Sequence, residues 1–93
     1  MPRFTVRVEL HDATWRDYTD LHTEMRRRGF STTISTDSGA AYHLPPAEYG
    51  YENSVTRDVV LEKAKAAAAA VRTSYSVLVT QSAGRTWHNL EPA

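Results

Sequence analysis

The 93-residue sequence contains no cysteine. Disulfide bonds, zinc–cysteine sites and thiol nucleophiles are therefore excluded. Without cysteines, the sequence does not indicate whether the protein works in an oxidising or a reducing compartment. The sequence also lacks an excess of one charge, with 11 basic and 11 acidic residues. Proteins that bind nucleic acid usually carry a basic excess, because phosphate contacts dominate their affinity. A nucleic-acid interface would therefore need a local basic patch, for which Arg26, Arg27 and Arg28 are the candidates.

Long apolar runs are absent as well. No segment approaches the roughly 18 apolar residues that suggest a membrane-spanning helix. The first ten residues alternate between polar and apolar types, whereas a signal peptide has a continuous apolar stretch. We therefore expect no membrane span and a cytoplasmic protein.

Several motifs that carry chemistry are missing. The four histidines form no H-x-x-x-H pair, and Gly29 and Gly84 are too isolated to form a phosphate-cradling loop. No G-x-S-x-G nucleophile motif occurs. We expect neither a metal site nor a cofactor.

The first third of the chain predicts a strand followed by a helix. Apolar and polar residues alternate from Phe4 to Leu10, which is the period of a strand with one buried face. A helix is expected over about 14–28, with Asp12 or Thr14 as the N-cap and Thr14 and Asp17 as a weak capping box. Gly29 suits the left-handed position after the helix. The following Phe30 would pack on Met25 of the helical apolar stripe.

The remainder predicts further strands and a second helix. Two strands are expected over 30–36 and 40–44, then a loop over 45–53 that begins at two prolines. Thr56 caps a helix over 56–72, with Val55 and Val60 as a hydrophobic staple and five consecutive alanines as strong helix formers. A long strand over 74–80 and a short terminal strand over 85–90 complete the chain.

This order predicts one α+β domain over residues 1–93. Its βαββαβ pattern is that of a ferredoxin-like sandwich, with two helices on one face of an antiparallel sheet. The helices are expected to cover Phe4, Val6, Val8, Ile34, Tyr42, Val77 and Val79. The opposite, open face is expected to show Thr5, Arg7, Glu9, Thr33, Ser35, His43, Ser76 and Thr80. That face carries no aromatic residue on which RNA bases could stack.

Glu9 is the most distinctive candidate for chemistry. It ends the first strand on the open face, close to His11, and the two groups together could perform acid–base work in a dimer. A purely structural role, in which Glu9 pairs with a neighbouring strand, is the alternative. Aromatic residues often anchor interfaces, which makes Tyr49, Tyr51 and Trp87 candidates for partner binding.

Residues 4–44 resemble the GhoS family, the endoribonuclease antitoxins of type V toxin–antitoxin modules, which have a Cas2-like ferredoxin fold. The resemblance comprises the acid that ends the first strand, the helical apolar residues, the turn glycine and the residues around them, namely Glu9, Leu21, Met25, Phe30, Ser31, Gly39 and Leu44. It implies an antitoxin with endoribonuclease activity. It also makes Glu9 and His22 candidate catalytic residues. Independently of the resemblance, a basic groove that contains Arg7 and Arg26–Arg28 would favour RNA binding.

One departure weakens the catalytic reading. The family has an arginine in the first helix at the position that His22 occupies in this chain, so a guanidinium that could bind phosphate in a bidentate manner is lost. Two hypotheses stay open: an antitoxin of this type, active or inactive as an endoribonuclease, and a non-catalytic module that binds a protein through its open face or an edge strand. RNA and protein are both possible partners, and we expect a homodimer.

Overall fold

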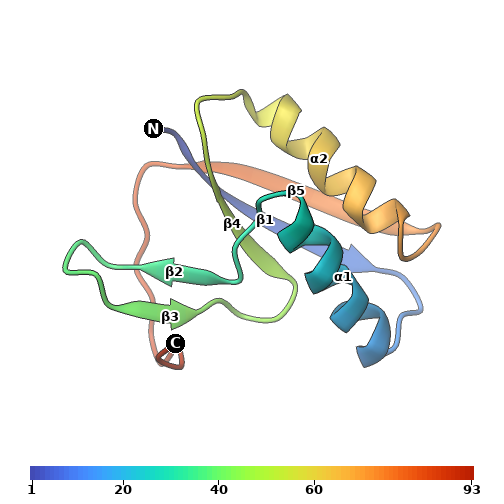
Figure 1. Cartoon of the computed structure of the whole chain (residues 1–93), viewed down its shortest axis with the longest axis horizontal. Coiled ribbons are helices and arrows are strands. Elements are labelled where there is room, and N and C mark those ends of the chain that lie inside the picture. Colours follow the sequence, from blue (N-terminus) through green and yellow to red (C-terminus); the bar gives the residue numbers. More distant parts are fainter.

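The computed structural model describes residues 1–93 and contains two helices and five strands (Figure 1). In chain order the elements are β1 (Arg3–Leu10), α1 (Trp15–Arg27), β2 (Thr33–Ser35), β3 (Ala41–His43), β4 (Glu48–Glu52), α2 (Arg57–Ala69) and β5 (Tyr75–Ser82). The expected α+β class and the ferredoxin-like arrangement are confirmed. Neither α1 nor α2 has the length and apolar character of a membrane-spanning helix.

Strand β1 is the centre of a three-stranded antiparallel sheet in the order β4–β1–β5. A separate hairpin of β2 and β3 meets this sheet where Ser31 faces Gly50. The N–H of each of these two residues donates to the carbonyl of the other at 2.8 Å. Beyond this single bridge the hairpin diverges from β4 and projects away from the helices (Figure 1).

Both helices lie on the same face of the three-stranded sheet. The side chains of Phe4, Val6 and Val8, which alternate along β1, are fully buried in one cluster. The same cluster takes residues from α1, α2 and β4, namely Leu21, Met25, Val60, Ala64, Ala67, Ala68 and Tyr49. The alternation of apolar and polar residues in β1 therefore corresponds to one buried and one exposed face, as predicted. The buried face packs against the helices, and the other, the open face, is directed away from them.

Local signals define both ends of α1 as predicted. Thr14 is the N-cap, and its hydroxyl accepts from the N–H of Asp17, whose carboxylate accepts from the N–H of Thr14. At the other end Gly29 has φ of +91°. The N–H of Phe30 donates to the carbonyl of Met25 at 3.1 Å, and that of Gly29 donates to Arg26 at 3.0 Å, which together form a Schellman motif.

Helix α2 also begins as predicted. The hydroxyl of Thr56 accepts from the N–H of Val59 at 3.3 Å, and Val55 packs against the core that contains Val60. The buried alanines on this helix let it approach the sheet closely.

Three expectations about the rest of the chain are wrong in detail. Residues 45–53 are not all loop, because 48–52 form β4 and pair with β1. Residues 85–90 form no strand, and strand-like pairing near the C-terminus occurs instead between Pro92 and Tyr42. Ile34 and Tyr42 do not join the helix-covered core, because the hairpin that carries them lies outside it.

Candidate functional site

Glu9 lies on the open face at the end of β1, beside His11. Oε1 of Glu9 is 3.5 Å from Nε2 of His11, and the two side chains are 65% and 41% exposed. Two serines also contact the imidazole. Oγ of Ser74, just before β5, is 2.8 Å from Nδ1, and Oγ of Ser76, in β5, is 3.1 Å from Nε2. The expected carboxylate–histidine pair is therefore formed within one chain. Both ring nitrogens already have hydroxyl partners, so proton exchange with a substrate would have to displace them.

His22 lies in a different environment, against the buried side chain of Tyr49. Its Nδ1 is 2.6 Å from the Tyr49 hydroxyl oxygen. Burial, assisted by the positive charge of Arg26, lowers the pKa of His22 below its usual value, and burial raises the pKa of Tyr49. Both groups are therefore neutral near pH 7. The Tyr49 hydroxyl has no other acceptor in the protein, so we assign it as the donor to Nδ1, which places the imidazole proton on Nε2.

A small hollow of about 220 Å³ adjoins this pair. His22, Arg26, His43 and Glu48 contribute its ionisable side chains. The hollow gathers one cation, one carboxylate and two imidazoles at the edge of the sheet. No group of three or more His, Asp or Glu residues is placed to hold a metal ion.

The two residues to which the resemblance assigns catalytic roles, Glu9 and His22, do not meet in one chain. Glu9 is exposed between the buried Val8 and Leu10, so its side chain lies on the open face. His22 contacts Tyr49, whose buried side chain lies on the helix-covered face opposite Val6 of β1. The sheet itself separates the two groups.

The arginines at the end of α1 are largely engaged within their own helix. Glu24 accepts from Arg28 Nη1 at 2.8 Å and from Arg27 Nη1 at 3.2 Å, and the hydrogen bond from Arg28 is the main cause of a lowered pKa at Glu24. Arg26 Nε donates to the carbonyl of His22 at 3.3 Å. Arg7 is exposed on the open face, across from Glu48 of β4. These four arginines do not form one basic groove.

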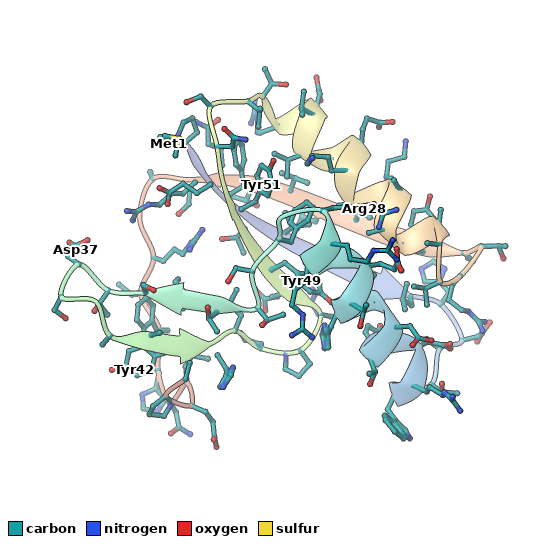
Figure 2. The ribbon with its side chains drawn as sticks, viewed as in Figure 1. Met1, Arg28, Asp37, Tyr42, Tyr49 and Tyr51 are labelled. Carbon is teal, nitrogen blue, oxygen red and sulfur yellow. The ribbon has the colours of Figure 1, made fainter.

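The three aromatic residues predicted as a partner surface do not form a patch. Tyr49 is fully buried beside α1, so its prediction as a surface anchor is wrong (Figure 2). Tyr51 packs in the core, with its ring centroid 4.9 Å from that of Phe30. Trp87 is 37% exposed and lies against Tyr42 of the hairpin, with ring centroids 5.6 Å apart.

The outer edge of β5 is a feature that the sequence alone did not reveal. The N–H of His11 donates to the carbonyl of Ser74. In an antiparallel pair the hydrogen-bonding groups alternate in direction, so the backbone N–H and C=O groups of Ser74, Ser76, Leu78 and Thr80 point toward β1. The backbone groups of Tyr75, Val77, Val79 and Gln81 consequently point outward, where no strand pairs with them. The alternation in 74–80 indicated a strand, but its edge position follows from the sheet order.

No protein-family model matches the chain, and it matches neither a curated protein nor a solved structure.

Proposed function

We propose that this chain is a non-catalytic binding module of the antitoxin type that recognises a protein strand at the outer edge of β5 and acts in the cytoplasm. The observation that carries the proposal is the composition of this edge. Strand β5 has eight residues, YSVLVTQS, with no charge, no proline and no glycine.

Such an edge is unusual for a strand that stays unpaired. Natural proteins protect edge strands with lysine, proline, bulges or short length, because free N–H and C=O groups pair readily with another chain. Strand β5 contains neither lysine nor proline, and it pairs with β1 along the whole length of β1. Adding a strand at such an edge is a common mode of peptide recognition, in which main-chain hydrogen bonds supply the affinity and alternate side chains supply the specificity.

Side chains beside this edge favour an apolar contact on the open face. Leu78 is 64% exposed there, flanked along β5 by Ser76 and Thr80. A partner strand with an apolar residue opposite Leu78 would remove this surface from water.

A second copy of the chain can also pair along this edge, which is why homodimerisation belongs to the proposal. In antiparallel pairing centred on Val79, Leu78 of one copy lies opposite Thr80 of the other, and no charges are brought together. The two-fold pairing would join two three-stranded sheets into one continuous sheet.

The experiment measures assembly and edge protection together. Sedimentation equilibrium at tens of micromolar is expected to give twice the 10.5 kDa chain mass, and hydrogen exchange should show protected amides at Val77, Val79 and Gln81. The double variant Leu78→Lys/Thr80→Lys should be monomeric, because like charges directly opposite each other destabilise a strand pair. Val59→Lys is the matched control, since Val59 is 44% exposed on α2, away from this edge. A monomeric parent with freely exchanging amides at these positions would refute the homodimeric part of the proposal.

RNA cleavage of the GhoS type is the second candidate function. The Glu9–His11 pair at the end of β1 favours it, because a carboxylate stands at the position where the resemblance places the acid. The separation of Glu9 from His22 and the pairing of Arg27 and Arg28 with Glu24 weigh against it. Cleavage requires cations that stabilise the charge that develops on phosphate, and these arginines are directed elsewhere.

A further inference from the structure

The side chain of Arg85 is a half-buried cation without a counter-ion. It follows β5 in the segment that returns toward the hairpin, and its Nη2 donates to the carbonyl oxygen of Phe4 at 3.0 Å. Its Nε–H is buried and has no acceptor in the protein, and no carboxylate forms an ion pair with it. Buried charges in proteins are normally paired, because desolvation of an isolated charge is costly. The position of Arg85 therefore requires an explanation beyond packing.

A second guanidinium lies close to the first. Arg3 lines the same hollows as Arg85, and Arg3 Nε donates to Glu52 Oε2 at 3.2 Å. Burial, together with the positive charge of Arg3, lowers the pKa of Arg85, whereas Glu52 acts in the opposite direction. An arginine keeps its charge even so. Glu52 forms its ion pair with Arg3, so the charge of Arg85 has no paired carboxylate and favours the approach of an anion.

These groups line a polar cleft between the hairpin and the three-stranded sheet. One part, of about 550 Å³, lies between β2 and β4 beyond the Ser31–Gly50 bridge. An adjoining part, of about 410 Å³, extends toward the segment after β5. Both parts share the hydroxyls of Ser35 and Thr36 as well as the two arginines. The cleft therefore combines hydroxyl donors with cations, which is a donor set suited to phosphate oxygens.

An aromatic ring lies at one end of this cleft. Trp87 lines the part of about 410 Å³, two residues after Arg85, and remains 37% exposed although it also contacts Tyr42. A planar base gains affinity by stacking on an exposed aromatic ring, as in complexes with single-stranded nucleic acids. A phosphate at Arg85 and a base at Trp87 would thus occupy one continuous site.

We propose that this cleft is a nucleotide-binding site, in which Arg85 and Arg3 hold the phosphate group and Trp87 stacks on the base. The site is distinct from the outer edge of β5 and is independent of the partner-binding function proposed above. A carboxylate at the tip of the hairpin, Asp37, also lines both parts of the cleft and opposes the anion (Figure 2). Its removal should strengthen binding, because one unfavourable charge is lost.

The two tryptophans of the chain allow a direct test. Trp15 is 81% exposed at the start of α1, so Trp15→Phe leaves Trp87 as the only indole emitter. Titration of this variant with adenosine 5′-monophosphate should quench the emission of Trp87 saturably, and inorganic phosphate should reverse the quenching by competition. A short RNA without terminal phosphates is the second probe and distinguishes a phosphodiester from a phosphate monoester as the source of the anion.

Variants of the cleft identify the groups that bind. In the Trp15→Phe background, Arg85→Met should weaken binding at least about tenfold, as expected when a hydrogen bond to a charged group is lost. Arg85→Lys, which keeps the positive charge but loses the bidentate guanidinium donors, should bind with intermediate affinity. Asp37→Asn should bind more tightly. Arg57→Met removes an exposed arginine of α2 outside the cleft and should bind like the parent.

Three results would overturn the proposal. These are the absence of saturable quenching at millimolar nucleotide, equal affinity in the Arg85→Met and Arg57→Met variants, and quenching that inorganic phosphate does not reverse. If Arg85→Met fails to fold, as judged by circular dichroism, the comparison of Arg85→Lys with the parent decides in its place. Equal affinity of these two would then exclude a guanidinium-specific site.

Discussion

The hydroxyl oxygen of Tyr49 lies 2.6 Å from Nδ1 of His22, and this contact joins β4 to α1 at the margin of the core. Their rings meet edge to face, with centroids 5.5 Å apart. Tyr49 is the largest fully buried side chain in the protein, so its hydroxyl depends on His22 for an acceptor. A buried polar group without such a partner would cost about 1–3 kcal/mol.

The protonation of His22 should couple stability to pH. Its pKa is lowered in the folded state, so below about pH 6.5, the usual histidine value, the unfolded chain binds a proton that the folded chain does not. The contribution of His22 to the free energy of unfolding is therefore complete above this pH and is lost as the pH falls toward the lowered folded-state pKa. Denaturant midpoints measured between pH 8 and pH 5 will show this decrease.

The variant His22→Gln is the control for the pH effect. Its amide oxygen can accept from Tyr49 but does not titrate, so the histidine part of the decrease should vanish. An identical pH dependence in the parent and the variant would assign the effect to other groups.

Met25→Ala should lower the free energy of unfolding by roughly 2–4 kcal/mol, the usual cost of truncating a buried methionine. Met25 is fully buried in the core cluster that also contains Phe30. Urea denaturation measures the change. Met25→Leu conserves the volume and should cost less than about 1.5 kcal/mol, and a parent-like midpoint for Met25→Ala would show that the site collapses without penalty.

Gly29→Ala should cost about 1–2 kcal/mol, because an L-residue is disfavoured in the left-handed region. Gly29 has φ of +91°, and an added Cβ would lie 3.4 Å from Cε1 of Tyr51. Gly84→Ala is the matched control, since its backbone is not left-handed and nothing lies within 4 Å of an added Cβ. Comparable midpoints for both alanine variants would contradict the role assigned to Gly29.

The purified protein should show little or no cleavage of RNA. We expect no difference between the parent, Glu9→Gln and His22→Ala on a panel of transcripts, with or without magnesium. The reason is that Glu9 and His22 lie on opposite sides of the sheet and that Glu24 engages Arg27 and Arg28. Sequence-specific cleavage by the parent, abolished by either substitution, would establish the second candidate function instead.

Features that depend on neighbours along the chain were predictable from the residues. The capping box of Thr14 and Asp17, the left-handed Gly29 and the staple of Val55 and Val60 each involve residues within about one or two helical turns of each other. The period of two in β1 likewise identified its buried face. Such signals are local, so the energies that favour them are nearly the same in any fold. These local signals were enough to predict the α+β class and the ferredoxin-like order of elements.

Features that depend on distant partners were not predictable in the same way. Prolines and a glycine around residues 45–53 indicated a loop, but pairing with β1 makes 48–52 a strand and buries Tyr49 opposite Val6. The separation of Glu9 from His22, the free edge of β5 and the contact of Arg85 with Phe4, 81 positions away, arise in the same manner. Each depends on which strands become neighbours. That choice is set by the combined burial of the core across the whole chain, and no short segment carries it.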